Sequence, residues 1–444
     1  ATGNNNSGVG FQAGIAVSTG TGNTLFGSSS GDAVTTGADN TFVGLNSGGA
    51  VTTADGHTAV GSGALLTMST GTTATAVGFE ALKVATGNDN TAVGFQAGVA
   101  VSTGTQNTIV GNKSGDAVTT GADNTFVGDS AGGAVTTASG HTAVGSSALL
   151  TMSSGTTGTA IGFEALKVAT GNDNTAIGYQ AGVAVSTGTQ NTLVGNVAGD
   201  AVTTGAGNTF VGDLSGSATT TVNNNTAVGS SALLVNSTGA GNTAIGALAL
   251  DANTTASNNV AVGVSALSAN TTGTDNVAVG ANALDAATTA SNNSALGDNA
   301  LCACTTGASN TAVGASSLEA HTDADNCTSV GADSLQTNTT GSGNTAVGQG
   351  ALNANSTGAL NTAVGYAALN ANTTAANNVA VGSSALAANT TGTNNVAVGA
   401  NALDANTTAS NNTAIGDNAL GVNVDGTSNT ALGSAALQAN TTGA

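Results

Sequence analysis

Few side chains in this sequence could act as catalytic bases, nucleophiles or metal ligands. Histidine is the usual general base near neutral pH, and cysteine is both a nucleophile and a zinc ligand. The chain has three of each: His57, His141, His321, Cys302, Cys304 and Cys327. What these residues could do depends on what surrounds them.

The histidines stand in places where the sequence otherwise has asparagine. His57 and His141 lie 84 residues apart at the same point of a repeated phrase, and His321 interrupts another row of asparagines. No serine or cysteine is repeatedly paired with them. We therefore interpret them as substitutions in polar rows, with catalysis or metal binding as the alternative.

The cysteines form a C-x-C pair, Cys302 and Cys304, with Cys327 further along. Zinc sites need a second pair or histidine partners, so the spacing fits zinc poorly. If this stretch is extended, Cys302 and Cys304 share a face. Free buried thiols are the favoured interpretation, and a local or interchain disulfide stays open.

The acidic residues lie near turns. Clustered carboxylates could bind Ca²⁺, but the 20 aspartates form no D-x-D-x-D-G loop. Glu80 and Lys83, repeated as Glu164 and Lys167, fall in two shortened repeats, where they indicate a local bulge rather than an acid–base pair. We expect no enzymatic activity and no cofactor, with Ca²⁺ as the alternative.

The charge balance excludes several partners. A formal charge of −20, with three Lys and no Arg, opposes binding to nucleic acid. No apolar run reaches the ~18 residues of a membrane span. Because 39% of the residues are hydrophobic and only 6% charged, the chain should fold.

A phrase of the type "NTAVG" recurs 26 times, with 17 residues between successive Gly residues except for 16 from Gly78 to Gly94 and from Gly162 to Gly178. A fixed period of this length predicts a solenoid. We number each coil from the Asn as position 1, so that the Gly is position 5. Positions 13 to 17 contain turn residues, so each coil should have two short strands and two turns, stacked into one rod of ~125 Å.

Position 4 is apolar in every coil, which predicts the core row: Val43, Val60, Val77, Val93, Val110, Val127, Val144, Ile161 and Ile177. Position 2 shares its face, and position 3, mostly Ala, lies on the other. Two apolar faces predict a thin solenoid that also packs against sister chains. Position 1 predicts a hydrogen-bonded asparagine ladder: Asn23, Asn40, Asn90, Asn107, Asn124, Asn174, Asn191, Asn242, Asn344 and Asn361.

Position 9 divides the chain into residues 1–235, with a five-coil pattern of Gly, Gly, Gly, Leu, Leu, and residues 236–444, with Leu throughout. Where position 9 is Gly, position 12 is usually Val, as at Val17, Val34, Val51, Val101, Val118 and Val135. Since protein cores are close-packed, we expect these valines to point inward and fill the missing volume.

The stretch "NTAVGQGALNANSTGALNTAVGYAALNANTTAANNVAVG" at 344–382 resembles the repeats of bacteriophage tail fibres and tail-fibre-domain adhesins. It is similar, more loosely, to head repeats of trimeric autotransporter adhesins. The resemblance implies a homotrimer of parallel β-solenoids that serves as a rigid extracellular stalk or receptor-binding shaft.

These observations together predict an all-β parallel solenoid (β-roll or β-helix) of about 26 coils, in a homotrimeric or filamentous assembly. We expect a structural, non-enzymatic fibre protein, located outside the cell, on its surface or on a virion. Its expected partners are copies of itself, as a trimer or stacked end to end, and a cell-surface glycan or receptor, without nucleic acid or membrane insertion. The alternative is a surface that binds ice or polysaccharide through Thr and Asn rows.

Overall fold

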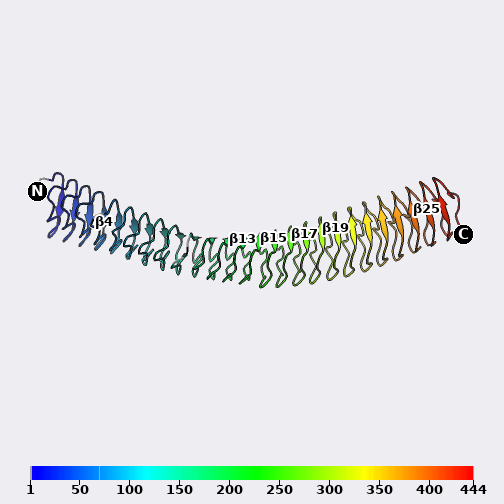
Figure 1. The fold of residues 1–444 in the computed structure, drawn as a ribbon, viewed down its shortest axis with the longest axis horizontal. Helices are drawn as coiled ribbons and strands as arrows, with labels where there is room; N and C mark the ends of the chain where they lie inside the picture. Colours follow the sequence, from blue (N-terminus) through cyan, green and yellow to red (C-terminus); the bar gives the residue numbers. More distant parts are fainter. Residues whose placement is uncertain (1–2, 70, 154, 156, 444) are drawn as a thin grey trace. The chain divides into compact units, whose positions relative to one another are not determined.

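The computed structural model describes residues 3–69, 71–153, 155 and 157–443, in two compact units, Ala1–Asn224 and Asn225–Ala444. Each unit is an all-β parallel solenoid, as the period predicts, in which every coil contributes one three-residue strand (Figure 1). The strands of the first unit are β1 Ser7–Val9, β2 Thr24–Phe26, β3 Thr41–Val43, β4 Thr58–Val60, β5 Thr75–Val77, β6 Thr91–Val93, β7 Thr108–Val110, β8 Thr125–Val127, β9 Thr142–Val144, β10 Thr159–Ile161, β11 Thr175–Ile177, β12 Thr192–Val194 and β13 Thr209–Val211. Those of the second are β14 Thr226–Val228, β15 Thr243–Ile245, β16 Val260–Val262, β17 Val277–Val279, β18 Ser294–Leu296, β19 Thr311–Val313, β20 Thr328–Val330, β21 Thr345–Val347, β22 Thr362–Val364, β23 Val379–Val381, β24 Val396–Val398, β25 Thr413–Ile415 and β26 Thr430–Leu432.

Successive strands within each unit pair in parallel, position for position. For example, Thr41, Phe42 and Val43 pair with Thr58, Ala59 and Val60. The 16-residue coils keep this register, since β5 still pairs Thr75 with Thr91. Equivalent side chains of neighbouring coils therefore stack in rows.

The second strand predicted for each coil is absent from the described residues. Positions 7, 9 and 17 adopt left-handed backbone angles, as at Asn46 (φ 55°), Leu65 (φ 48°) and Asp39 (φ 55°), and such residues interrupt an extended strand. The chain between them still bonds to the next coil, for example from Thr35 N–H to Thr52 C=O at 2.8 Å. The turns are thus hydrogen-bonded coil to coil without forming a second sheet.

The Gly at position 5 is required by the stacking. Gly44 has φ 137°, and a Cβ there would lie 2.6 Å from the carbonyl oxygen of Gly61 in the next coil. Any side chain would therefore collide with the neighbouring backbone as well as strain its own. This contact explains why the repeated phrase always ends in Gly.

The predicted core row is wrong, because position 3 points inward and position 4 outward. Position 3 is buried in every strand from β2 to β26. Of the predicted row, Val43, Val93, Ile161 and Ile177 are 36–39% exposed. Val60, Val77, Val110, Val127 and Val144 are half-buried. Where position 9 is Leu, that side chain fills the coil interior and leaves room only for Ala or Ser at position 3.

The first unit fills its interior partly from position 12. Val34, Val51, Val101, Val118 and Val135 are fully buried, which confirms the predicted compensation for Gly at position 9, and Val17 is half-buried. Position 3 also supplies volume: the Phe42 ring occupies the place of a side chain at Gly48, where a Cβ would lie 2.5–2.7 Å from ring atoms.

The second unit fills the same space differently. Position 9 is Leu in every coil, as at Leu301 and Leu403, and these leucines adopt left-handed conformations with φ near 50°. They are buried except in the last coil, where Leu437 is 51% exposed. Position 3 is Ala in twelve of the thirteen strands, Ser329 being the exception. Leu at position 9 of the second unit thus fills the space that Leu, Ile or Phe at position 3 fills in the first unit.

Candidate functional site

The asparagines at position 1 are buried and linked from coil to coil. Asn40 donates from Nδ2 to Oδ1 of Asn23 at 3.1 Å, and its backbone N–H donates to the same oxygen at 3.1 Å. Nδ2 also donates to the carbonyl of Ala54 at 2.9 Å. All ten residues of the expected ladder are at most 1% exposed: Asn23, Asn40, Asn90, Asn107, Asn124, Asn174, Asn191, Asn242, Asn344 and Asn361. Their polar atoms serve the coil interior.

A second asparagine ladder lies at position 12 of the second unit, in the row that His321 interrupts. Asn372 donates to Asn355 Oδ1 at 2.7 Å and to Ala375 C=O at 3.1 Å, and its own Oδ1 accepts from Asn389 at 3.2 Å. The recurrence of Asn at this position is the sequence signal of the polar row expected around His321.

The histidines take the place of asparagines in these ladders. His57 Nε2 donates to Gly71 C=O at 3.0 Å, and Nδ1 accepts from the Ala74 N–H at 2.9 Å. His141 makes the same two bonds with Gly155 and Gly158. His321 lies in the second ladder, bonded to Ala324 C=O and Asn338.

Burial lowers the pKa of all three histidines. They therefore stay neutral near pH 7, with both ring nitrogens engaged in structural bonds.

The cysteines are unpaired thiols at different depths. Cys304 is buried at position 12, where burial raises its pKa to about 12, and its thiol donates to Gly307 C=O at 3.4 Å. Cys327 is buried at position 1, and Cys302 is only half-buried. The expectation that Cys302 and Cys304 share a strand face is wrong, because neither lies in a strand. Buried protonated thiols are poor nucleophiles.

The carboxylates are dispersed along the coils. Within the residues that the structure describes, no three His, Cys, Asp or Glu side chains gather in a way that could hold a metal ion. Partial burial raises the pKa of Asp116, Asp200, Asp251 and Asp404, all at position 10. Ca²⁺ binding stays an untested alternative.

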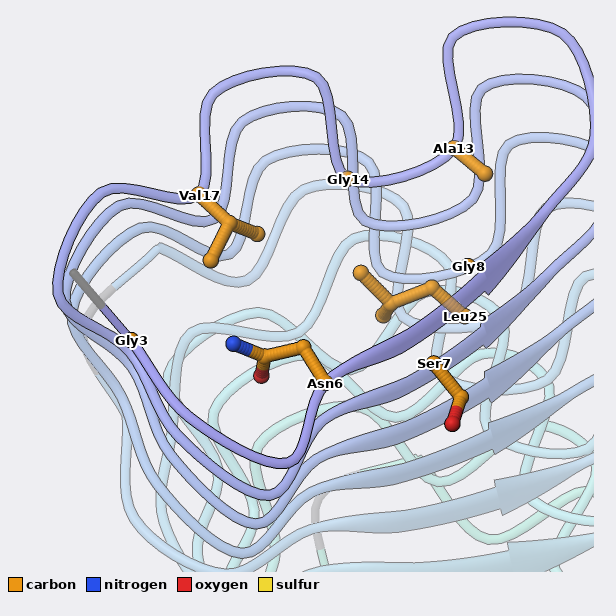
Figure 2. A pocket seen from close by; sticks show the side chains of 8 residues that line it. All are labelled: Gly3, Asn6, Ser7, Gly8, Ala13, Gly14, Val17 and Leu25. Atoms are coloured by element: carbon orange, nitrogen blue, oxygen red, sulfur yellow. The ribbon is translucent and has the colours of Figure 1, made fainter. Parts of the chain in front are cut away.

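One hollow lies in the first coil. Figure 2 shows Asn6, Val17 and Leu25 pointing into the space enclosed by this coil, whereas Ser7, at position 2, points away from it. The hollow is lined by the same rows that fill the other coils. It is the coil interior seen end on.

The outer strand face is the most extensive uniform surface of each unit. Positions 2 and 4 form two parallel rows, Thr, Val or Ser in the first and Val, Ile or Leu in the second, with Phe26 as an aromatic member. None of the strands β1 to β26 contains a charged residue. The −20 charge of the chain lies entirely on the turns.

No protein-family model and no curated protein matches this sequence. Function therefore has to be argued from the surfaces themselves. Among the described residues, no helix is long and apolar enough to cross a membrane.

Two aromatic patches lie just beyond the strand face, at position 6. The first aromatic patch consists of Phe79, Glu80, Lys83, Phe95 and Gln96. Its rings stack with centroids 5.4 Å apart and planes 11° apart. Glu80 Oε1 lies 2.7 Å from Lys83 Nζ, and Oε2 accepts from Gln96 at 2.9 Å. The Lys83 and Gln96 contacts hold the pKa of the Glu80 carboxyl below its ordinary value.

The second aromatic patch repeats the first. It consists of Phe163, Glu164, Lys167, Tyr179 and Gln180, with ring centroids 5.5 Å apart. The ion pair is again 2.7 Å and the Gln180 bond 2.8 Å. The sequence drew attention to the Glu and Lys of both patches but assigned them to a local bulge. The aromatic partners at position 6 were missed, although "GFE" and "GFQ" stand in consecutive coils.

Proposed function

We propose that this chain is a structural fibre protein, whose coils form a rigid stalk or adhesin shaft in a homo-oligomeric assembly. The proposal includes an extracellular location, on a cell or virion surface. One observation carries it: the outer strand face is uncharged in every coil of both units, and its position 4 row is apolar throughout.

An apolar face of this extent favours a partner. In the first unit thirteen strands at ~4.8 Å spacing give an apolar strip roughly 60 Å long. Monomeric proteins rarely expose contiguous apolar patches above a few hundred Å². Position 4 residues such as Val43, Val93 and Ile177 keep 36–39% of their surface exposed. Packing these rows together would remove this surface from water, at about 25 cal/mol per Å².

The partner that fits is another copy of the chain. The face is neutral while the rest of the chain is acidic. Two copies can therefore meet through their strand faces and keep their like-charged turns apart. A trimer is the arrangement implied by the resemblance to phage and autotransporter fibres.

Sedimentation equilibrium of the full chain tests this proposal. Wild type is expected to sediment at three times the chain mass of 41.2 kDa. The variant Val43→Asp/Val110→Asp/Val127→Asp should fall to the monomer mass, because it buries charges in the interface. Thr53→Asp/Thr120→Asp/Thr137→Asp adds the same charge to exposed turns of the same coils and should not dissociate. A monomeric wild type would refute the proposal.

A second candidate function is binding to ice. Position 2 is Thr in every strand from β2 to β13, so a regular row of outward hydroxyl and methyl groups follows the first unit. A repeating row of this kind can match a crystalline surface. A thermal-hysteresis assay tests this candidate by comparing the melting and freezing temperatures of ice in a solution of the protein. Equal temperatures would exclude ice binding.

A further inference from the structure

The two aromatic patches concentrate chemistry that the rest of the chain lacks. The chain has ten aromatic residues, eight Phe and two Tyr, and four of them lie in these patches. Both ion pairs found among the described residues lie there as well. In a chain with 6% charged and 2% aromatic residues, this co-location marks the patches as distinct from the repeating coil.

Coil packing does not account for the rings. Phe79, Phe95, Phe163 and Tyr179 are 45–50% exposed. Coils with Ser at position 6, such as those of Ser62 and Ser146, form the same strands and turns. The aromatic side chains are thus not needed to build the coil.

The shortened coil does not require the rings either. In a 17-residue coil three successive N–H groups, those of Thr35, Thr36 and Gly37, bond to one carbonyl, that of Thr52. In the 16-residue coil only Thr86 and Gly87 bond to the equivalent carbonyl of Ser102. The missing residue is therefore at position 14, eight positions along the coil from the aromatic residue.

Each patch presents a ring face that no aromatic neighbour covers. Phe79 and Phe95 cover each other's facing sides. The outer face of Phe79 looks toward the preceding coil, where position 6 is Ser62, whose side chain is too small to cover a phenyl ring. Phe163 looks toward Ser146 in the same way. The first patch therefore presents an aromatic face beside the carboxylate of Glu80, the ammonium of Lys83 and the amide of Gln96.

We propose that each aromatic patch binds an uncharged pyranose unit of a glycan. The C–H groups on one face of the sugar pack on the exposed aromatic face, whose quadrupole is negative. Its hydroxyls then reach the groups beside the ring. Glu80 accepts one bond from Lys83 and one from Gln96, and the ammonium has two further donors.

Electrostatics select a neutral ligand. Each patch contains one negative and one positive side chain, so it carries no net charge. The surrounding chain is strongly acidic, which disfavours polyanionic glycans and nucleic acid alike.

The two patches can act together on one polymer. Phe79 and Phe163 lie 84 residues apart, which is five coils or about 24 Å along the first unit. Linked sites of this kind can raise overall affinity by about 10²–10⁴ over one site.

Native affinity electrophoresis in gels containing soluble galactomannan tests the proposal. Wild type should be retarded relative to a gel without polysaccharide. Phe79→Ser/Phe95→Ser or Phe163→Ser/Tyr179→Ser should each raise the apparent dissociation constant by about 100-fold, and the quadruple variant should migrate as if no polysaccharide were present. Ser already occupies position 6 in other coils, so these variants keep the coil.

The matched control is Tyr366→Ser, which removes an exposed aromatic residue at position 6 of the second unit that has no stacked neighbour. It should leave the retardation unchanged. Tyr179→Phe should also bind as wild type, because it keeps the ring. Unretarded wild type, or equal retardation of the quadruple variant, would overturn the proposal.

The inference does not rest on the structural role proposed above. The variant Val43→Asp/Val110→Asp/Val127→Asp should lose its oligomeric mass and still be retarded by galactomannan, since each chain carries both patches. The experiments can therefore contradict glycan binding without contradicting the oligomeric fibre, and the reverse.

Discussion

The two units build one backbone coil with two different interiors. In the first unit, nine of the thirteen coils have Gly at position 9, and most of these have Leu, Ile or Phe at position 3 and Val at position 12, while the other four pair Leu with Ala. In the second, Leu at position 9 faces Ala, and position 12 carries a second asparagine ladder. The strand, the position 1 ladder and the Gly at position 5 are common to both. The stacking backbone thus fixes the fold, and the interior tolerates either apolar side chains or hydrogen-bonded polar ones.

The largest expected effect tests the apolar filling. Phe126 is fully buried, and a Cβ at Gly132 would lie 2.8 Å from its ring. Phe126→Ala should reduce the free energy of unfolding by about 3–5 kcal/mol. Adding Gly132→Leu converts this coil to the pattern of the second unit and should recover part of the loss. Denaturant unfolding of the two variants measures this, and no recovery would contradict the exchange of volume between positions 3 and 9.

The second ladder should be nearly as sensitive. Asn372→Ala removes the partners of Asn355 Oδ1, the Ala375 carbonyl and the Asn389 amide. Each group left unpaired in the interior should cost about 1–3 kcal/mol. Asn370→Ala, at the half-buried position 10 of the same coil, is the control and should cost less. Equal losses in the two variants would show that the ladder adds no specific stability.

The histidines should make stability depend on pH. Burial lowers the pKa of His57 and His141 in the folded chain below the ordinary value of 6.5. The unfolded chain then binds more protons, so stability is complete above pH 6.5 and falls by up to about 1.4 kcal/mol per pH unit and histidine below it. The aspartates at position 10 have a raised pKa in the folded chain, so their protonation at lower pH increases the free energy of unfolding instead of reducing it.

Denaturant unfolding between pH 7 and pH 5 measures this dependence. The variant His57→Asn/His141→Asn restores the asparagine ladder of the first unit. It should reduce the change in the free energy of unfolding with pH by the contribution of two histidines. His321→Asn in the second unit should reduce it by the contribution of one. An unchanged slope in both variants would refute neutral buried histidines.

The smallest effect concerns the ion pairs, which among the described residues occur in the first unit. Lys83 and Glu80 lie at the surface, and exposed pairs contribute about 0–1 kcal/mol. Lys83→Gln should therefore change the midpoint of thermal unfolding little. A large loss of stability would mean that the patch serves the coil rather than a ligand.

Much of the fold could be predicted from the repeat. The 17-residue spacing, the β-branched residues and the Asn at position 1 indicated a parallel solenoid, because each is a property of stacked identical layers. The inward face could not be predicted reliably, since hydrophobicity pointed to Val43 and its equivalents, whereas a buried Leu at position 9, such as Leu65, leaves room only for the smaller Ala59 opposite it. The aromatic patches were missed because Phe79 and Phe95 are separated by a coil in sequence and meet only through the register.

Thiol labelling in one coil tests most directly whether the outer strand face is covered in the native assembly. Val43→Cys lies on that face, Val51→Cys in the buried interior and Thr53→Cys on an exposed turn. Each is made with Cys302→Ser, Cys304→Asn and Cys327→Asn, and its maleimide reaction rate is measured in the folded chain. Packing against other copies predicts that position 43 reacts as slowly as position 51, while position 53 reacts quickly. Reaction at position 43 as fast as at position 53 would contradict a fibre assembled through its strand face.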